Sequence, residues 1–263
     1  MNVGVIGVGV VGGACKFGFE LLGHNVSVHD IAFDTTIDDV LDTAAVFICV
    51  PSPRADDGSC DVSIVEQVIS DLKERDYKGI LAIKSTVVPG TTERLREETG
   101  LNICFVPEFL RERCAETDFT ENHDLCIVGT GSYEVFNLVK DSHGKYPKEV
   151  RMVTPTEAEL CKYFNNTFNS TLITFANSFF EICESLNTNY TTIKDCMVTI
   201  DHIPDKYLDC NKSFRGFGGM CLPKDTKALN NLCESNDLPV TFFKMLLDEN
   251  DKYKTTVYKG MRK

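Results

Sequence analysis

The chain has 263 residues, of which 43% are hydrophobic and 25% charged, and its formal net charge at pH 7 is −12. This composition is typical of a globular protein with one or two domains and a sizeable core. The negative charge argues against nucleic acid and anionic membranes as partners, because both require a basic surface. No apolar run approaches the roughly 18 residues that cross a bilayer, and the amino terminus lacks the basic region of a signal peptide. We therefore expect a cytoplasmic protein.

The twelve cysteines are scattered along the chain. They form neither a C-x-x-C pair nor a Cys/His cluster at metal-ligand spacing, so we expect no metal site. In a reducing compartment most of them would be buried thiols.

Short β-type runs alternate with helical patterns through the first half of the chain. The clearest helical pattern is at 61–76, where apolar residues recur on one face. Alternation of strands and helices predicts a doubly wound, parallel, Rossmann-type sheet. We assign residues 1–153 to this domain. The six predicted strands cover residues 2–6, 25–30, 46–50, 80–84, 102–106 and 124–129.

The pattern changes after Pro155. Residues 156–186 form one helical pattern that is longer than most globular helices, and a second helical region begins near Lys224. We assign residues 154–263 to a mostly α-helical domain built on this long spine helix. Its aromatic-rich face predicts a homodimer formed along the helix; the alternative is that the helix packs only within its own chain.

Residues 7–12 read G-V-G-V-V-G, a G-x-G-x-x-G motif that follows a strand and opens a helix. In such a motif the first glycine permits a tight turn, the second lets the backbone approach a pyrophosphate, and the third lets the helix pack closely. Asp30, at the end of the second strand, would accept a hydrogen bond from a ribose hydroxyl and repel a 2′-phosphate. The motif therefore predicts NAD as the cofactor. The expected contacts are Gly7, Gly9, Val11, Gly12 and Asp30.

Polar or proline-fixed motifs follow three further strands, at 51–53, 85–86 and 107–108. Each alone is an ordinary turn signal. Ligands of open α/β sheets bind outside the carboxyl ends of the strands, so together these motifs are candidates to line one crevice. We expect Pro51, Ser85 and Thr86 near the cofactor.

The stretch SFRGFGGMCLPKDT, at 213–226, places Cys221 behind three glycines and ahead of Pro223. Proline suits the first turn of a helix, so Cys221 would lie at a helix N-terminus, where free N–H groups favour a thiolate. A thiolate beside NAD indicates chemistry at an aldehyde: addition gives a thiohemiacetal, and loss of its hydride leaves a thioester. Glu108 is the best placed carboxylate to assist hydrolysis of that thioester.

Five motifs, in the same order, make the chain similar to the UDP-glucose/GDP-mannose dehydrogenase family. They are the glycine fingerprint, CVPSP at 49–53, KST at 84–86, PEFLRE at 107–112 and the cysteine loop. An NKSF run at 211–214 most resembles the bacterial-type UDP-glucose 6-dehydrogenases. The family oxidises the C6 alcohol of a nucleotide sugar to a carboxylate with two NAD⁺ and a covalent cysteine intermediate. The resemblance therefore implies oxidation of a nucleotide sugar, most simply of UDP-glucose to UDP-glucuronate.

The resemblance also implies roles for individual residues. Cys221 would be the nucleophile, and Asp225 the carboxylate that helps proton transfer. Lys162 would stabilise oxyanions formed at C6. Asn166, one turn further on the same helix face, would orient water and substrate.

Residues of the strand-end motifs are expected to complete the site. Thr86 would hold the catalytic water, and Glu108 would assist thioester hydrolysis. Glu112 is expected near the cofactor. The resemblance further implies substrate contacts from Phe109, Leu110, Lys162, Asn166, Phe217, Gly218 and Gly219.

Two features depart from the family pattern. Family members continue into a third domain that closes over the nucleotide, whereas this chain ends 42 residues after Cys221. Only 15 residues separate Asp30 from Val46, so the helix that the family places after its second strand would be nearly absent. We therefore expect a shortened member without the carboxyl-terminal nucleotide-sugar-binding domain. Two alternatives remain: an NAD-binding or regulatory homologue with impaired catalysis, and the same chemistry on GDP-mannose or a UDP-N-acetylhexosamine.

Overall fold

The computed structural model describes residues 1–55 and 58–255. The chain divides into two compact units. The first comprises residues 1–53 and 60–162, and the second residues 54–59 and 163–263. This division falls inside the long helix, and the expected domain boundary at 153/154 stays a prediction.

A seven-stranded sheet forms the centre of the first unit, with the order β2-β1-β3-β4-β5-β6-β7. Neighbouring strands are parallel, except that β6 runs antiparallel to β5. The strands are β1 (Asn2–Ile6), β2 (Asn25–His29), β3 (Ala45–Ile48), β4 (Ile80–Ile83), β5 (Ile103–Phe105), β6 (Leu125–Gly129) and β7 (Glu149–Val153).

The predicted Rossmann-type architecture is confirmed, with two corrections. The sheet is mixed rather than wholly parallel, because β6 pairs with β5 only through Phe105 and Gly129 in the antiparallel sense. Strand β7 was not predicted. It lies at the edge of the sheet, where Glu149 and Arg151 are exposed, so it lacks the continuous hydrophobic run of the buried strands β3 and β4.

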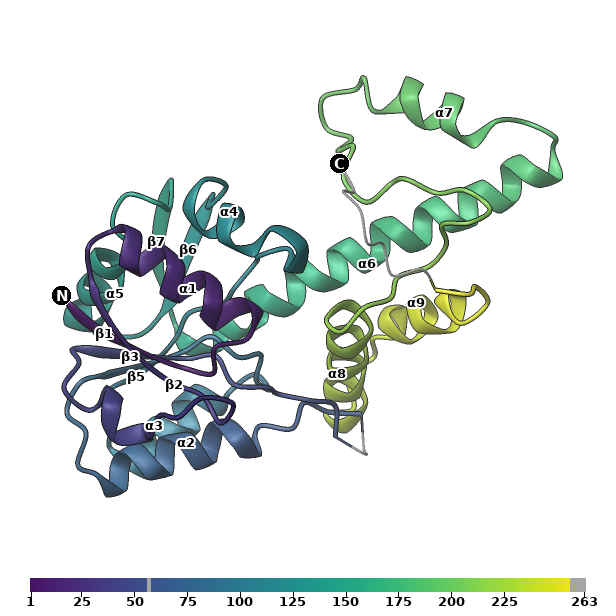
Figure 1. Ribbon diagram of the computed structural model, residues 1–263. Coiled ribbons are helices and arrows are strands. Elements are labelled where there is room, and N and C mark those ends of the chain that lie inside the picture. Colours follow the sequence, from purple (N-terminus) through teal and green to yellow (C-terminus); the bar gives the residue numbers. More distant parts are fainter. Residues whose placement is uncertain (56–57, 256–263) are drawn as a thin grey trace. The chain divides into compact units, whose positions relative to one another are not determined.

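Helices cover both faces of this sheet (Figure 1). Helices α1, α4 and α5 pack on one face, and α2 and α3 on the other. A single 3₁₀ turn, η1, follows β2, in agreement with the expected loss of a helix there. The helical elements are α1 (Val10–Leu21), η1 (Ile37–Val40), α2 (Ser63–Glu74), α3 (Thr91–Thr99), η2 (Glu112–Cys114), α4 (Ala115–Thr120) and α5 (Tyr133–His143).

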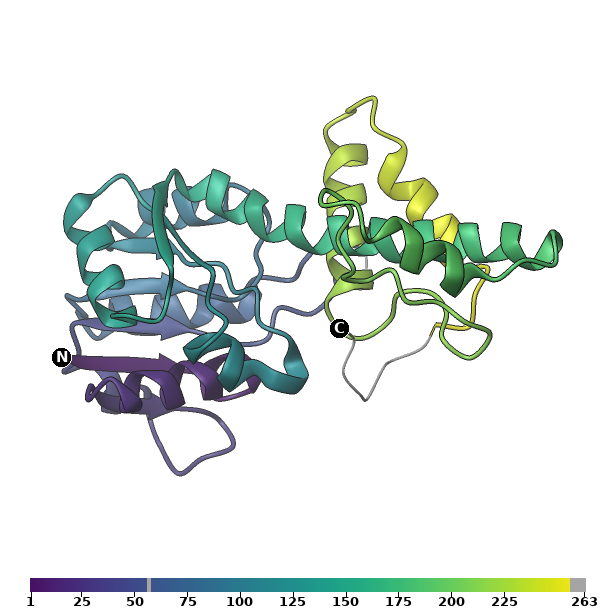
Figure 2. The same cartoon turned by 90° about the horizontal axis from the view of Figure 1, so that it is seen from above.

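The second unit is helical, and its main element is the carboxyl-terminal part of α6 (Pro155–Ser185). The bounds of α6 lie within one residue of the prediction. The second predicted helical region is two helices, α8 (Leu222–Ser235) and α9 (Phe242–Asn250), which pack together (Figure 2). Helix α7 (Tyr190–Met197) was not predicted. A small core of the second unit includes Ala176, Phe180, Cys183, Tyr190, Leu208 and Cys210.

Within the second unit, α6 buries polar side chains and exposes aromatic ones, although Ile173, Ala176 and Phe180 are also buried. Its buried polar residues are Asn166, Thr167, Ser170, Thr174 and Asn177. Its exposed apolar residues include Phe164, Phe168, Phe175 and Ile182, which are 73%, 48%, 57% and 49% exposed. Among the helices of residues 1–55 and 58–255, none has the length and hydrophobicity that a bilayer span requires.

Candidate functional site

The glycine-rich turn between β1 and α1 uses its three glycines for different reasons. Gly7 has a φ of +85°, and a Cβ there would lie 2.8 Å from the backbone carbon and oxygen of Cys49. A Cβ on Gly12 would lie 1.9 Å from the carbonyl oxygen of Gly7. A Cβ on Gly9, the N-cap of α1, would meet nothing within 4 Å. Packing therefore demands Gly7 and Gly12, whereas Gly9 borders open space.

Asp30 holds this turn in place. Its Oδ2 accepts a 2.6 Å hydrogen bond from the N–H of Val8, and its Oδ1 accepts one of 2.9 Å from the N–H of Ala32. The hydrogen bonds from Ala32 and Val8 lower the pKa of Asp30 below its ordinary value. The carboxylate thus contacts the turn itself; its expected contact with a ribose stays a prediction.

A cavity of about 490 Å³ opens at the start of α1. Gly9 lines it from one side and Glu112, of the PEFLRE motif, from the other. No side chain caps the N-terminus of α1, whose N–H groups favour an anion. Arg113 adds a cationic side chain to the lining. The structure therefore brings Gly9 and Glu112, which we expected to contact the cofactor, to one cavity, whose lining also includes the carboxylate of Glu116.

An ion pair shapes the loop that carries Glu112. Arg111 donates to both carboxylate oxygens of Asp118, at 2.8 Å from Nε and 2.5 Å from Nη2, and its N–H donates at 2.9 Å. Burial alone would raise the pKa of Asp118, but Arg111 lowers it to about 2. Arg111 lies in the PEFLRE motif, but Asp118 follows it by seven residues, and no sequence pattern indicated that the two side chains would pair.

Glu108 is paired with a buried lysine. Lys84 Nζ lies 3.0 Å from Glu108 Oε2, and the two side chains are 1% and 6% exposed. Burial would lower the pKa of Lys84 and raise that of Glu108, but their mutual attraction reverses both shifts. Glu108 is therefore ionised in a dry environment, and its Oε1 also accepts from the N–H of Phe109 at 2.8 Å. Lys84 was not predicted as a site residue, although it lies in the KST motif.

The other strand-end motifs lie at the same edge of the sheet, since β3, β4 and β5 are neighbours and parallel. Ser85 is buried and donates from Oγ to the carbonyl of Val50 at 2.6 Å, next to the exposed Pro51. Thr86 is half-buried, and its carbonyl accepts from the thiol of Cys60 at 3.1 Å. These contacts hold the two strand ends together.

Lys162 lies at this edge through its position on α6. Its ammonium donates to the carbonyl of Glu108 and lies 5.8 Å from the centre of the Phe109 ring. One turn earlier, the buried carboxylate of Glu159 accepts from the N–H of Gly90 at 2.6 Å and from that of Thr92 at 2.8 Å. Glu159 therefore attaches the start of α6 to the loop before α3 and positions Lys162 beside Glu108. Leu110, the next predicted contact after Phe109, is half-buried.

In the second unit, Cys221 is exposed and is the N-cap of α8. Asp225, one turn later, is fully buried. Its Oδ2 accepts from Asn166 Nδ2 at 2.5 Å, and its Oδ1 lies 2.7 Å from Lys224 Nζ. Three residues expected in the catalytic site, namely Asn166, Cys221 and Asp225, thus belong to one packed arrangement of α6 and α8.

The glycine loop before Cys221 is partly buried and partly open. Phe217 is 1% exposed, so its side chain belongs to the core, and the predicted substrate contact could come only from its backbone. Gly218 is half-buried and Gly219 is exposed. Gly219 has a φ of +81°, and a Cβ there would meet nothing within 4 Å.

The predicted catalytic residues therefore form two sets. Thr86, Glu108 and Lys162 belong to the first unit, and Asn166, Cys221 and Asp225 to the second. Each set is ordered by contacts within its own unit. Within residues 1–55 and 58–255, no group of three or more His, Cys, Asp or Glu side chains is arranged to hold a metal ion.

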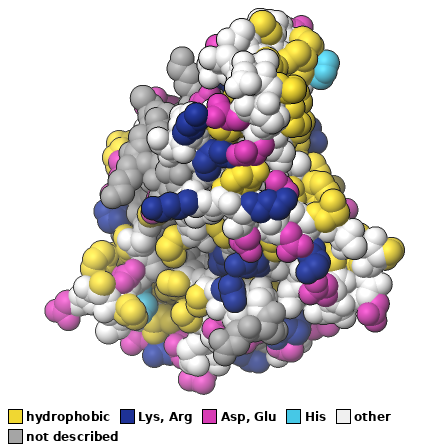
Figure 3. Space-filling view, turned by 90° about the vertical axis from the view of Figure 1, so that its right-hand side faces the viewer, with side chains coloured by type: hydrophobic (Ala, Val, Ile, Leu, Met, Phe, Trp, Pro, Cys, Tyr) yellow, Lys and Arg dark blue, Asp and Glu magenta, His cyan; other side chains and the backbone are white. Residues whose placement is uncertain are grey.

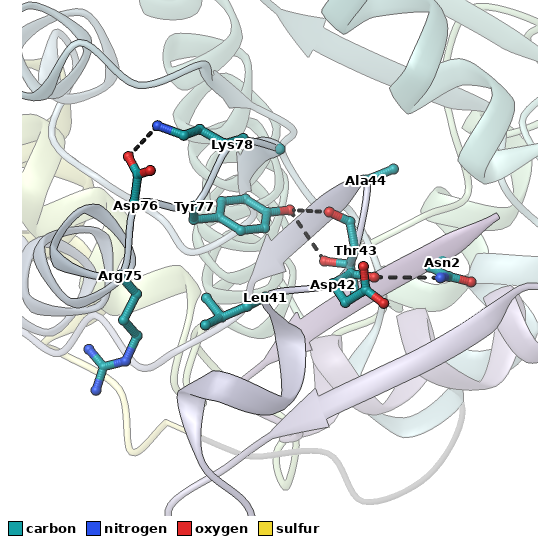
Figure 4. Close-up of a pocket in the computed structure, with 10 residues that line it drawn as sticks. Asn2, Leu41, Asp42, Thr43, Ala44, Arg75, Asp76, Tyr77 and Lys78 are labelled. Atoms are coloured by element: carbon teal, nitrogen blue, oxygen red, sulfur yellow. Dashed lines mark hydrogen bonds and ion pairs between the residues drawn. The ribbon is translucent and has the colours of Figure 1, made fainter.

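Two further cavities lie away from these residues. The first, of about 410 Å³, is at the amino ends of β1 and β3, opposite the carboxyl ends that carry the motifs. In Figure 4 the hydroxyl of Tyr77 donates to the carbonyl of Thr43 at 3.0 Å, and Lys78 points toward Asp76. Its tyrosine hydroxyl and its lysine thus already have partners within the protein.

The other cavity, of about 960 Å³, lies in the second unit and is lined by Arg215, Lys252 and Tyr253 among others. Arg215 is paired with Glu181, and Lys252 with Glu249. Figure 3 shows basic and acidic side chains beside one another across the middle of one face of the molecule. The lining also includes Lys212 and Lys254, so basic side chains outnumber acidic ones around this cavity.

Comparison with known proteins agrees with this arrangement. Residues 31–143 match the NAD binding domain of the UDP-glucose/GDP-mannose dehydrogenase family, and residues 156–252 match its central domain. UDP-glucose 6-dehydrogenase AglM of Haloferax volcanii is 28% identical over 95% of the chain, and UDP-glucose 6-dehydrogenase TuaD of Bacillus subtilis is 27% identical over 90%. A UDP-glucose dehydrogenase structure from Pyrobaculum islandicum superposes with a TM-score of 0.87 and 29% identity over 95% of the chain.

These relatives are longer than the chain. It spans 70% of the Haloferax protein, 53% of the Bacillus protein and 68% of the Pyrobaculum structure. The two family matches follow one another along the sequence and together include β3 to β6 and the cysteine loop. The chain belongs to the UDP-glucose/GDP-mannose dehydrogenase family, and it contains that family's NAD-binding and central domains.

Proposed function

We propose that this chain carries the NAD-dependent oxidation of the C6 alcohol of a nucleotide sugar, UDP-glucose to UDP-glucuronate, with Cys221 as a covalent nucleophile. One observation carries the proposal. Cys221 is exposed at the start of α8, while Asp225, one turn later, is buried and hydrogen-bonded to Asn166. The names of the Haloferax and Bacillus relatives support UDP-glucose as the substrate.

The glycine-rich turn fits the cofactor. Open space beside Gly9, the uncapped N-terminus of α1 and Arg113 suit a pyrophosphate, and the carboxylate of Asp30 suits an unphosphorylated ribose. Bound NAD would accept the hydrides that conversion of an alcohol to a carboxylate releases. Glu112, which lines the same cavity, would border the bound cofactor.

The residues of the second unit suit the covalent step. Loss of a hydride from C6 and of the hydroxyl proton would first convert the alcohol to an aldehyde. The Sγ of Cys221 would then add to its carbonyl carbon, forming a C–S bond and an oxyanion. Loss of hydride from that carbon would leave a thioester, and attack by water would break the C–S bond, release the carboxylate and return the thiolate. The N-terminus of α8 would stabilise a thiolate at Cys221 before and after these steps.

The residues of the first unit suit charge stabilisation and hydrolysis. Lys162 would neutralise the oxyanion, since it presents a cation beside Glu108. Glu108 would accept a proton from the attacking water, which requires its ionised form. Lys84 maintains that form, because it holds the pKa of the buried carboxyl below its ordinary value.

The test is NADH formation by the chain with a panel of UDP- and GDP-sugars. We expect two NADH for each UDP-glucose consumed and no UDP-glucuronate from Cys221→Ser. Cys196→Ser is the matched control, since Cys196 is the other exposed cysteine, and it should behave as the unaltered chain. Turnover to UDP-glucuronate by Cys221→Ser would contradict the nucleophile role. No NADH with any sugar would favour the NAD-binding or regulatory alternative.

We further propose a homodimer formed along α6. Phe164, Phe168 and Phe175 are at least 48% exposed on one helix, and a two-fold axis would pack this face against its own copy. Sedimentation should give a dimer for the chain and a monomer for Phe175→Asp. Tyr133→Asp, at a 76% exposed position outside the helix, should remain dimeric. A monomeric unaltered chain would contradict the proposal.

A further inference from the structure

Two buried asparagines hold the loop that leads to Cys221. Asn177 belongs to α6 and is 1% exposed, and Asn250 is the last residue of α9 and is 6% exposed. Both direct their side-chain amides at three consecutive loop residues, 215–217. We call this pair the asparagine clamp.

Asn250 captures both backbone groups of Phe217. Its Oδ1 accepts from the N–H of Phe217 at 2.7 Å, and its Nδ2 donates to the carbonyl of Phe217 at 3.1 Å. A side-chain amide in this geometry replaces the neighbouring strand that a buried backbone would otherwise need. The loop thus obtains regular hydrogen bonding without secondary structure.

Asn177 accepts hydrogen bonds from the two residues before Phe217, namely Arg215 and Gly216. Its Oδ1 accepts from the N–H of Gly216 at 3.1 Å and from Nε of Arg215 at 2.7 Å. Its Nδ2 donates to the carbonyl of Ile173 on the same helix at 2.7 Å, which fixes the direction of the amide. Both asparagines therefore use their oxygen toward N–H donors and their nitrogen toward a carbonyl.

The clamp explains one glycine of the loop. Gly216 has a φ of +61°, and a Cβ there would lie 2.9 Å from Asn250 Oδ1. Arg215, next to it, lies between the rings of Phe180, 4.8 Å away, and Tyr253, 4.4 Å away. The backbone before Phe217 is therefore held by side chains from α6 and from the segment around the end of α9.

Cys221 lies between this clamp and a second anchor. After the cysteine, Asp225 is bonded to Asn166, and Thr226 Oγ1 lies 3.0 Å from Ser170 Oγ. Asn166, Ser170 and Asn177 are all buried residues of α6. Between the two anchors, Gly219 borders open space and Met220 is 79% exposed.

We propose that Asn177 and Asn250 are positioning residues for Cys221, a role that rests on the nucleophile function proposed above. They fix the path of the loop so that the cysteine stays at the N-cap of α8, where the helix stabilises its thiolate. Asn250 follows the cysteine by 29 positions, so the geometry of the nucleophile depends on a segment that follows α8. The charged neighbours of Cys221 on α8, Lys224 and Asp225, are the same in every variant below.

The test is the pH profile of alkylation of Cys221 by iodoacetamide, followed by mass spectrometry of the peptide that contains it. This reaction needs neither NAD nor a sugar. We expect Asn250→Ala to raise the midpoint of the profile by about half to one pH unit, a roughly threefold to tenfold loss of thiolate at a given pH. Asn250→Asp retains an acceptor for the N–H of Phe217 and should give an intermediate midpoint.

Two further measurements separate positioning from a general loss of structure. Asn236→Ala removes an exposed amide at the end of α8, which donates to the carbonyl of Leu232 on the same helix, and should leave the midpoint unchanged. Hydrogen exchange should show loss of protection at Gly216 and Phe217 in Asn250→Ala, with α6 still protected. An unchanged midpoint in Asn250→Ala, despite this loss of protection or a lower melting temperature, would overturn the proposal. An ordinary thiol midpoint in the unaltered chain would instead overturn the proposed thiolate.

Discussion

The two glycine-rich stretches of this chain, at 7–12 and 216–219, are held in different ways. The first is packed against its own backbone and against Cys49, and it receives one carboxylate, that of Asp30 from the next strand. The second is held by side-chain amides that lie 39 and 33 positions away along the sequence. The conformation of the first stretch can therefore be predicted from its own short motif. The conformation of the second stretch depends on distant residues that its motif does not contain.

The largest effect should come from breaking the buried ion pair between Lys84 and Glu108. Lys84→Met leaves the carboxylate of Glu108 buried without its counter-charge, so we expect a loss of about 3–5 kcal/mol in the free energy of unfolding. Urea unfolding measures it. The double variant Lys84→Met/Glu108→Gln should recover part of that loss, because no charge is then buried. A loss below about 1 kcal/mol in the single variant would mean that Glu108 is not ionised in the folded protein.

Alanine variants of Gly12 and Gly9 distinguish a glycine that packing requires from a glycine that borders the expected cofactor site. Gly12→Ala would place a Cβ against the carbonyl oxygen of Gly7, and overpacking of a backbone in this way should cost about 3 kcal/mol. Gly9→Ala should cost less, about 1 kcal/mol, because its Cβ meets nothing and alanine is only a poorer N-cap than glycine. The same variant should weaken NAD binding at least about tenfold by calorimetry. Unchanged NAD affinity in Gly9→Ala would show that the pyrophosphate does not approach this turn.

Acid tests a carboxylate of the first unit, that of Asp118 beside Arg111, whereas the asparagine amides that hold the second stretch do not titrate. The folded-state pKa of Asp118 is depressed to about 2 from an ordinary 3.8, so its contribution of about 2 kcal/mol is present above pH 4 and is lost as the pH falls through 2. The stability difference between the unaltered chain and Asp118→Asn should shrink accordingly as the pH is lowered. A difference that stays constant with pH would contradict the ion pair with Arg111.

The smallest effect should be the difference in stability between the alanine variants of Gly216 and Gly219, the two glycines of the second stretch that have positive φ. Gly216 and Gly219 both have positive φ, so alanine at either position should cost roughly 1 kcal/mol in backbone strain. At Gly216 the added Cβ also meets Asn250 Oδ1, so Gly216→Ala should cost roughly 1 kcal/mol more than Gly219→Ala. Equal losses of stability in thermal unfolding would mean that Asn250 of the asparagine clamp moves away from the added Cβ without a cost in free energy.

The sequence predicted those parts of the fold whose signal is local. Strands β3 and β4 are buried continuous apolar runs and were predicted, whereas β7, with Glu149 and Arg151 exposed at the edge, was not. Helix α6 was predicted from its aromatic periodicity, but several of those aromatic residues are exposed, and its buried residues include polar ones such as Asn166, Ser170 and Asn177. Periodicity identified the helix; it could not identify which face is buried, because burial depends on α8 and the loops that pack against it.

The candidate site divides in the same way. Cys221, Asp225, Glu108 and the glycines were predicted because each belongs to a short motif. Their supporting residues come from elsewhere in the chain or pair over distances that a motif does not encode. These supporting residues are Lys84, Arg111, Asp118, Asn177 and Asn250.

The most direct test of the account is the mass of the chain after brief mixing with NAD and UDP-glucose, quenched in acid within the first turnovers. We predict a covalent adduct of the oxidised sugar nucleotide on the peptide that contains Cys221, and no adduct in Cys221→Ser. Oxidation of UDP-glucose with no adduct, or with an adduct on another of the twelve cysteines, would contradict the account.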